Sequence, residues 1–341
     1  MISSPAILEE PMHAGKNNAD ELAGLVSGAT VIRRDEPLAK RTTLRVGGPA
    51  DLYAEPASEA DLVAVLKFCG ARGLKFFVLG RGSNLLVRDG GFRGVVICLA
   101  HAAFSGIEIS GTGVPPVRFD SDDTMSDGTH GRDAGATRII CGAGAKLKNV
   151  AVEAKRNGLA GLEFLEGIPG SVGGALRMNA GAMSGATFDV VESVRLMDFN
   201  GHVCELAPSQ MAVEYRCCAT LKNHIALGAV LKGRPDARAA IEQRMNDYSQ
   251  KRWASQPAKP SAGCAFKNPA GHSAGRLIDE LGLKGTRVGG AVVSAEHGNF
   301  IVNDGTATAR DVLALMEILK QRVKAERGIE LHTEVEIIGE D

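Results

Sequence analysis

The sequence predicts a soluble globular protein that mixes strands with helices and divides them between two domains. Its 341 residues exceed what one hydrophobic core usually organises. Hydrophobic residues make up 44% and charged residues 23%, which is the balance of an ordinary soluble protein. Short strand-like stretches alternate with amphipathic helix patterns, and we find no internal repeat.

In the N-terminal part of the chain, the sequence patterns typical of helices and strands appear only gradually. Residues 1–30 are expected to be a mobile lead-in, with a short helix indicated near residues 19–26. A strand follows at residues 51–55. Ser58 and Asp61 have the spacing of a capping box, which predicts the start of a helix. Its apolar face would be made of Leu62, Val65, Leu66 and Cys69.

A buried strand at residues 75–79 runs into a turn rich in glycine. Consecutive backbone N–H groups in such a turn, beside a hydroxyl and an arginine, suit a pyrophosphate. The pattern is not the nicotinamide fingerprint, because Leu85 replaces its third glycine. A plain tight turn is the alternative. The five residues of the turn are Gly80, Arg81, Gly82, Ser83 and Asn84.

The next strand, at residues 94–99, is followed by a segment without periodicity. Residues 111–135 contain two prolines and many Asp, Ser, Thr and Gly, and they read as a disordered insertion into a hairpin. The pattern resumes at residues 137–141, continues through Gly142 and Gly144, and enters an amphipathic helix that Gly158 stops.

Residues 161–185 form the most glycine-dense stretch of the chain, with seven glycines and Pro169. A strand would favour β-branched residues here, and a helix does not tolerate so much glycine. Close approach of the backbone to a large, flat, partly polar ligand explains the composition. A flexible linker is the alternative, but Ile168 and Val172 argue against it.

The remaining chain supplies strands at residues 190–198, 202–206 and 227–231 and a charged helix at 237–252. We place the domain boundary between residues 222 and 223. In the second domain, Ser273 would cap a short helix, and Thr308 with Asp311 forms a second capping box. The last strand, residues 332–338, would carry Glu334 and Glu336 on one face.

Composition excludes several classes of function. The formal net charge of −1 argues against binding to nucleic acid or to a membrane surface. No apolar run is long enough to span a membrane. The seven cysteines are scattered without metal-ligand spacing, which is typical of reduced thiols in a cytoplasmic protein.

Six sequence motifs are distributed over residues 41–341. They read TLRVGGPA from Thr43, VLGRGSNLLVRDGGFRGVVI from Val78, GLEFLEGIPGSVGGALRMNAGA from Gly161, EYR from Glu214, PSAGCAFKNPAG from Pro260 and TEVEIIG from Thr333. Four are long and two are short, and together they are far more specific than any one alone. In this order they resemble the UDP-N-acetylenolpyruvoylglucosamine reductase family.

The resemblance implies an α+β fold. Residues 31–222 would be a two-lobed FAD-binding domain of the vanillyl-alcohol-oxidase type, and residues 223–341 a C-terminal α+β substrate-binding domain whose last strand returns to the active site. FAD would be bound non-covalently and reduced by NADPH. The other partner would be a nucleotide-sugar, with no obligate protein partner. The resemblance places the FAD-binding residues at Gly80, Arg81, Gly82, Ser83, Asn84, Gly142, Gly144, Ile168, Pro169, Gly170, Ser171, Gly173, Gly174, Asn179 and Gly181.

The resemblance also implies the reacting residues. Hydride addition to an enolpyruvyl double bond leaves an enolate, and Arg216 occupies the position of its stabilising cation. Glu334 matches the second catalytic residue. Tyr215, Lys267 and Asn268 would contact the substrate. Without the resemblance, a surface salt bridge and an exposed strand charge would explain Arg216 and Glu334.

Cys264 stands where the family motif usually has serine. A thiol with an ordinary pKa near 8.5 is a stronger acid than an alcohol, so Cys264 is expected to donate the proton to C2 and to be sensitive to oxidation. If Cys264 were only a small core residue, Ser261 would donate instead. Two other functions remain open, an oxidase on the same flavin fold and a non-catalytic flavin-binding protein.

Overall fold

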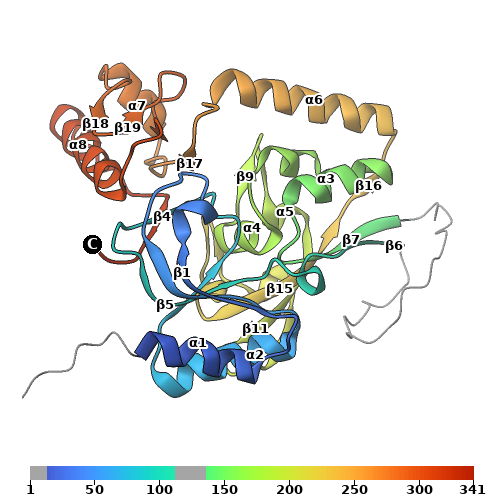
Figure 1. The fold of residues 1–341 in the computed structure, drawn as a ribbon. Helices are drawn as coiled ribbons and strands as arrows, with labels where there is room; N and C mark the ends of the chain where they lie inside the picture. Colours follow the sequence, from blue (N-terminus) through green and yellow to red (C-terminus); the bar gives the residue numbers. More distant parts are fainter. Residues whose placement is uncertain (1–13, 112–135) are drawn as a thin grey trace, which may run out of the picture.

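The computed structural model describes residues 14–111 and 136–341. Two sheets and their helices make up the larger part, and residues from about 256 onward form a separate body (Figure 1, orange to red). One hydrophobic core is shared by the two sheets, and another fills the C-terminal body. Within the described residues no helix is long and apolar enough to cross a membrane.

The first sheet has four strands in the order β1-β2-β5-β3. Its antiparallel pair is β1 (Val31–Pro37) with β2 (Pro49–Glu55). Parallel neighbours follow, β2 with β5 (Phe92–Cys98) and β5 with β3 (Phe76–Leu79). The parallel crossover between β2 and β3 is helix α2 (Glu59–Arg72), which Ser58 caps by accepting a hydrogen bond from the Asp61 backbone N–H.

The N-terminal lead-in is shorter than predicted. Helix α1 (Ala14–Leu25) belongs to the shared core, and Leu22 on its inner face is fully buried. Asp61 ties the following turn down, because its carboxylate accepts hydrogen bonds from Ser27 and from the Thr30 hydroxyl. Residues 14–30 are therefore part of the fold, which the weak sequence pattern did not reveal.

Leu22→Ala should lower the free energy of unfolding by about 2–5 kcal/mol, because it removes a fully buried side chain and leaves a cavity. Leu25→Ala on the same helix is the matched control, since that side chain is 55% exposed. Urea denaturation measures both. Equal stability of the two variants would show that α1 does not contribute to the core.

The second sheet is antiparallel throughout, in the order β12-β11-β15-β7-β6. The middle strand, β15, begins two residues after the predicted domain boundary. Because β15 pairs with both β11 and β7, the boundary prediction is wrong. The strands are β6 (Ile107–Gly111), β7 (Ala136–Gly142), β11 (Val191–Asp198), β12 (Val203–Leu206) and β15 (His224–Lys232).

Helices α3 (Leu147–Arg156) and α4 (Val172–Met178) pack against this second sheet. Helix α6 (Arg238–Ser255) joins them, because its Ile241 and Met245 are buried in the shared core. The first domain thus extends to about residue 255. Strands β6 and β7 pair antiparallel, which confirms the predicted hairpin, while residues 112–135 of the predicted insertion lie outside the described residues.

The C-terminal body is a four-stranded antiparallel sheet, in the order β17-β20-β19-β18, with two helices. Thr308 and Asp311 form the predicted capping box at the start of the longer helix. The elements are β17 (Ser261–Cys264), α7 (Ala274–Glu280), β18 (Arg287–Val288), β19 (Ala291–Val293), β20 (Phe300–Asn303) and α8 (Ala309–Arg327).

Backbone pairing ties the two bodies together. Strand β21 (Glu336–Ile338), near the C-terminus, pairs in parallel with β4 (Leu85–Val87) of the first domain. Leu86 of β4 points into the C-terminal core, and its neighbours Leu85 and Val87 point into a small core of the first domain. Asp89 then accepts hydrogen bonds from the first two backbone N–H groups of α8.

Short elements complete the described chain. They are β8 (Leu159–Ala160), β9 (Gly181–Ala182), β10 (Gly185–Ala186), α5 (Thr187–Val190), β13 (Val213–Glu214), β14 (Cys217–Cys218), β16 (Arg234–Pro235) and the 3-10 turns η2 (Leu38–Arg41), η3 (Ala102–Phe104), η4 (Glu163–Gly167), η5 (Pro208–Gln210) and η6 (Ala219–Lys222).

Candidate active site

Arg216 and Glu334 meet although 118 residues separate them in the chain. The Arg216 Nε donates to Glu334 Oε1 at 2.9 Å. Both side chains are mostly buried, with 22% and 13% of their surfaces exposed. Burial raises the pKa of Glu334, and the Arg216 charge and hydrogen bond oppose that rise. The pair therefore presents a fixed guanidinium in a partly dry environment.

Arg216 is held in an unusual backbone conformation. It is the second of the two residues, Tyr215 and Arg216, that connect β13 with β14, and its φ is +57°. A turn with positive φ at that position normally has glycine or asparagine there. An arginine in that place is strained, and such strain is concentrated at functional sites.

Three of the residues predicted to bind the cofactor, Asn84, Asn179 and Gly181, lie against this pair or its backbone. The Asn84 side-chain amide donates to the Glu334 backbone oxygen at 3.0 Å. The Asn179 amide donates to the Glu214 backbone oxygen at 3.2 Å and so steadies the hairpin that carries Arg216. At Gly181, an added Cβ would lie 3.3 Å from an Arg216 guanidinium nitrogen, so glycine leaves room for that side chain.

Cys264 faces the same pair from the C-terminal domain. Gly263, with φ +77°, interrupts the register between β17 and β20 just before it. The next residue, Ala265, accepts a hydrogen bond from the Glu334 backbone N–H at 2.9 Å, so the two segments run side by side. Burial first, and then the Glu334 charge, raise the pKa of the Cys264 thiol to about 12, and Arg216 lowers it only in part.

The raised pKa argues against the expected sensitivity of Cys264 to oxidation. Oxidants and alkylating agents attack the thiolate, and a thiol whose pKa is raised by burial carries little thiolate at pH 8. The thiol is therefore a protonated group throughout the neutral range.

We expect iodoacetamide to label Cys264 far more slowly than Cys204, which is exposed on β12. The rate at Cys264 should keep rising up to at least pH 11, because the fraction of thiolate still grows there. Peptide mass spectrometry after timed labelling measures both rates in one sample. Equal labelling at pH 8 would contradict the assignment of a high pKa.

Two of the three predicted substrate contacts, Lys267 and Tyr215, interact with the Arg216–Glu334 pair, and the third, Asn268, holds the start of α7. Lys267 is near enough for its charge to lower the pKa of Glu334. Asn268 uses its side-chain oxygen to accept the Ala274 N–H at the start of α7, at 3.0 Å. Tyr215 is 57% exposed, and the Arg216 guanidinium lies 5.0 Å from its ring centre.

A cavity of about 370 Å³ lies between the two sheets of the first domain. Its lining includes four cationic side chains and no carboxylate among the described residues. An elongated ligand with an anionic centre fits this mixture of cationic side chains and nearby backbone. Six of the residues predicted to bind the cofactor line the cavity, namely Gly80, Arg81, Gly144, Ser171, Gly173 and Gly174.

The glycine-dense stretch contains a helix, contrary to the prediction. Gly173 and Gly174 lie in the first turn of α4, and the Gly173 N–H donates to the Ala143 backbone oxygen at 2.8 Å. A Cβ on Gly173 would lie 3.1 Å from the Ala143 Cβ. This close packing outweighs the cost of about 1 kcal/mol that glycine carries in a helix.

The other predicted cofactor residues do not line the cavity. Gly82 and Gly142 are packing glycines, because an added Cβ would lie 2.3 Å from the Arg41 oxygen or 2.2 Å from the Phe104 oxygen. Gly170 lies close to Ser83, with an added Cβ 3.7 Å from the serine hydroxyl. Ile168 and Pro169 precede it in the same loop, away from the described lining.

Sequence reasoning missed several residues of the lining. Lys146 and Asn149 enter it from the start of α3, Lys222 from the end of η6, His224 from the start of β15, and Phe199 from the turn after β11. The motif Gly142-Ala143-Gly144, two residues before Lys146, was the one available signal. The others come from elements that meet only in the folded protein.

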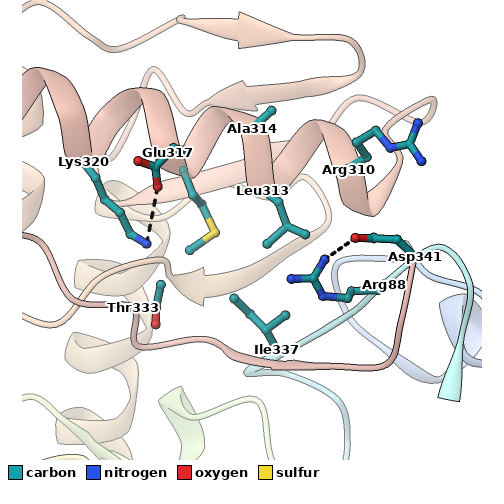
Figure 2. Close-up of a pocket in the computed structure, with 10 residues that line it drawn as sticks. Arg88, Arg310, Leu313, Ala314, Glu317, Lys320, Thr333, Ile337 and Asp341 are labelled. Atoms are coloured by element: carbon teal, nitrogen blue, oxygen red, sulfur yellow. Dashed lines mark hydrogen bonds and ion pairs between the residues drawn. The ribbon is translucent and has the colours of Figure 1, made fainter. Parts of the chain in front are cut away.

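A second cavity, of about 400 Å³, lies between α8 and the segment leading to the C-terminus (Figure 2). Two of its cations are already paired, Arg88 with Asp341 at 2.5 Å and Lys320 with Glu317 at 3.9 Å. It contains none of the predicted site residues, and we assign it no ligand. No group of His, Cys, Asp and Glu among the described residues is arranged to hold a metal ion.

Comparison with known proteins gives a consistent result. An FAD binding domain model matches residues 50–114 and 123–207, and the model of the C-terminal domain of UDP-N-acetylenolpyruvoylglucosamine reductase matches residues 256–338. The reductase of Clostridium botulinum (strain 657) is 39% identical over 97% of this chain and 99% of its own length. That of Clostridioides difficile (strain 630) is 41% identical over 91% of this chain and 94% of its own.

A solved structure of UDP-N-acetylenolpyruvylglucosamine reductase from Thermus caldophilus superposes with a TM-score of 0.72 at 38% identity, over 90% of this chain and 99% of that one. The α+β fold with an FAD-binding domain is thereby confirmed. Identity at this level and coverage shows the family, and the chain belongs to the UDP-N-acetylenolpyruvoylglucosamine reductases.

Proposed function

We propose that this protein reduces UDP-N-acetylglucosamine enolpyruvate to UDP-N-acetylmuramate with electrons from NADPH, a step in the synthesis of peptidoglycan precursors. The family of the chain supports the reaction. The convergence of Arg216, Glu334 and Cys264 on one centre carries the mechanism, because three groups from two domains meet where the reaction needs a cation, its partner and an acid.

The cavity between the two sheets would hold FAD. Arg81 and Lys146 suit its pyrophosphate, and the first turn of α4 brings backbone close to it. FAD held there would supply the hydride chemistry between NADPH and C3 of the enolpyruvyl group. The protein residues would act on the enolate that remains after hydride addition.

Negative charge then develops on C2 and on the substrate carboxylate, and Arg216 is placed to stabilise it. Glu334 accepts the Nε hydrogen bond and fixes the plane of the guanidinium, so the other N–H groups face in a set direction. This arrangement supports a role for a carboxylate beside an enolate, in which Glu334 acts through Arg216. Lys267 adds positive charge nearby.

Cys264 would give its S–H proton to C2 and complete the reduction. A donor must be protonated when the enolate forms, and the high pKa of this thiol keeps it protonated at neutral pH. The enolate is itself a strong base in the transition state, which compensates for the weak acidity of the thiol.

Anaerobic stopped-flow spectroscopy tests the proposal. NADPH should bleach the flavin absorbance, and the UDP-linked enolpyruvyl sugar should restore it without oxygen. Restoration by oxygen alone would indicate an oxidase, and no bleaching with either nicotinamide would indicate a non-catalytic flavoprotein.

A further inference from the structure

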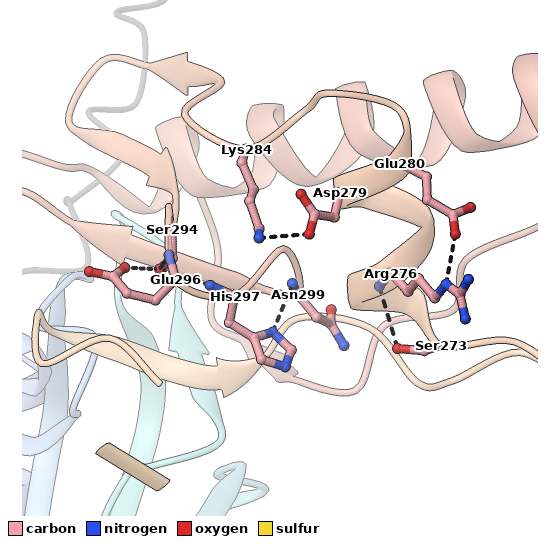
Figure 3. Close-up of polar contacts among 9 residues, drawn as sticks. All are labelled: Ser273, Arg276, Asp279, Glu280, Lys284, Ser294, Glu296, His297 and Asn299. Atoms are coloured by element: carbon pink, nitrogen blue, oxygen red, sulfur yellow. Dashed lines mark hydrogen bonds and ion pairs between the residues drawn. The ribbon is translucent and has the colours of Figure 1, made fainter. Parts of the chain in front are cut away.

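Asn299 is a buried polar residue beside Cys264 that the reaction described above does not use. It lies in the turn before β20, and 3% of its surface is exposed. Figure 3 shows this turn, in which the Asn299 backbone N–H donates to His297 Nδ1 at 3.1 Å. The preceding Ser294 is equally buried and accepts from the Glu296 N–H at 3.1 Å.

The Asn299 side chain holds the segment after Cys264 by hydrogen bonds to both backbone groups of Phe266. Its oxygen accepts the Phe266 N–H at 2.9 Å, and its NH₂ group donates to the Phe266 oxygen at 2.7 Å. The Asn299 backbone oxygen also accepts the Ala265 N–H at 2.8 Å. On the opposite side, Ala265 accepts from Glu334, so the segment is fixed between the two.

Cys264 directly precedes this segment, and Asn299 is also a neutral polar neighbour that affects its thiol. Because Asn299 fixes Ala265 and Phe266 by hydrogen bonds, it also fixes the backbone that carries the Cys264 sulfur.

We propose that Asn299 is a positioning residue for proton donation: its side chain holds the backbone of residues 264–266, and with it the Cys264 sulfur, in place. This inference rests on the proposed function, because it assigns Asn299 a role in the same step. The alternative is that Asn299 only stabilises the C-terminal domain.

Asn299→Asp tests the positioning role. The aspartate keeps an oxygen for the Phe266 N–H but, as a carboxylate, has no hydrogen for the Phe266 oxygen, so it loses half of its hold on the segment after Cys264. We expect reduction by NADPH to stay within about twofold of wild type and reoxidation by the enolpyruvyl substrate to slow by roughly 10- to 100-fold, the range that misplacement of a reacting group produces. Stopped-flow absorbance measures both half-reactions.

Asn303→Asp is the matched control. Asn303 is at the end of β20, the strand that follows Asn299, and is 5% exposed, but its amide donates to the Leu44 oxygen at 3.0 Å. We expect it to lower thermal stability as Asn299→Asp does and to leave the ratio of the two half-reactions unchanged. If it slows reoxidation selectively as well, the effect is structural and the proposal is wrong.

A double mutant decides whether Asn299 acts through Cys264. In the Cys264→Ala background, Asn299→Asp should slow reoxidation by less than about twofold, because the interaction it served is already gone. A further loss as large as in the wild type would overturn the proposal. If Asn299→Asp does not fold, Asn299→Ser, which introduces no charge, is judged by the same criteria.

Different experimental results would contradict the proposed function and the role of Asn299. If the flavin of the Cys264→Ala variant is reoxidised at a normal rate, the thiol is not the proton donor, and Asn299 cannot position it for that role. Collapse of Cys264→Ala together with normal reoxidation by both Asn299 variants would overturn the positioning role only.

Discussion

Cys264→Ala is expected to abolish the second half of the reaction while the first half survives. Flavin reduction by NADPH needs no proton donor to carbon, so its rate should be near that of wild type. Reoxidation by the enolpyruvyl substrate should slow by about 10²–10⁴-fold, the usual contribution of a general acid. Rapid-mixing absorbance under anaerobic conditions follows each half separately.

Cys264→Ser is the matched variant for this experiment. It should stay active, because a hydroxyl is the usual group at this position in the family motif and is nearly the same size. Normal reoxidation of Cys264→Ala would mean that another group donates the proton. Ser261, at the start of β17, would then be the next residue to change.

Gly174→Val should give folded protein that is colourless or holds little FAD. Gly174 lines the cavity, and an added Cβ would meet only the Ser171 hydroxyl, at 3.6 Å, which is ordinary contact. The protein itself tolerates the new atoms, so the branched side chain would occupy space that the cofactor needs. Visible absorbance per polypeptide measures the loading, and thermal denaturation followed by circular dichroism measures the fold.

Gly70→Val is its control, because Gly70 is exposed on α2 and nothing lies within 4 Å of an added Cβ. It should cost little stability and no flavin. Gly82 is not a suitable test, since its positive φ of +61° and the Arg41 oxygen would strain any side chain whether or not cofactor binds. Full flavin content in Gly174→Val would place the cofactor elsewhere.

Local signals in the sequence predicted local structure well. The capping residues Ser58 and Thr308 start α2 and α8 where predicted, because a cap depends on residues only three positions apart. The left-handed Gly158 follows the end of α3 for a similar reason. The motifs also singled out Arg216, Glu334 and Cys264, which the fold brings together, although they cannot show that Arg216 and Glu334 are hydrogen-bonded.

Features that depend on tertiary packing were mispredicted. The sequence pattern of α4 argues against a helix, and only the backbone of Ala143 beside it explains why glycine is needed there. The domain boundary was placed too early because nothing local shows that β15 is a central strand. Asn84 and Asn179 look like ligand amides in the sequence, yet they bond to backbone that lies 250 and 35 residues away.

The parallel pairing of β4 with β21 has a consequence for the kinetics of folding. The loop that this pair closes contains most of the chain, since Glu336 is hydrogen-bonded to Asn84. Closing a long loop is entropically costly, and contacts between distant residues form late. On dilution from denaturant, the antiparallel second sheet should therefore regain its structure before Glu334 reaches Arg216. A refolding chain would pass through a stage with an ordered sheet but no catalytic pair, visible as a lag between recovered circular dichroism and recovered turnover.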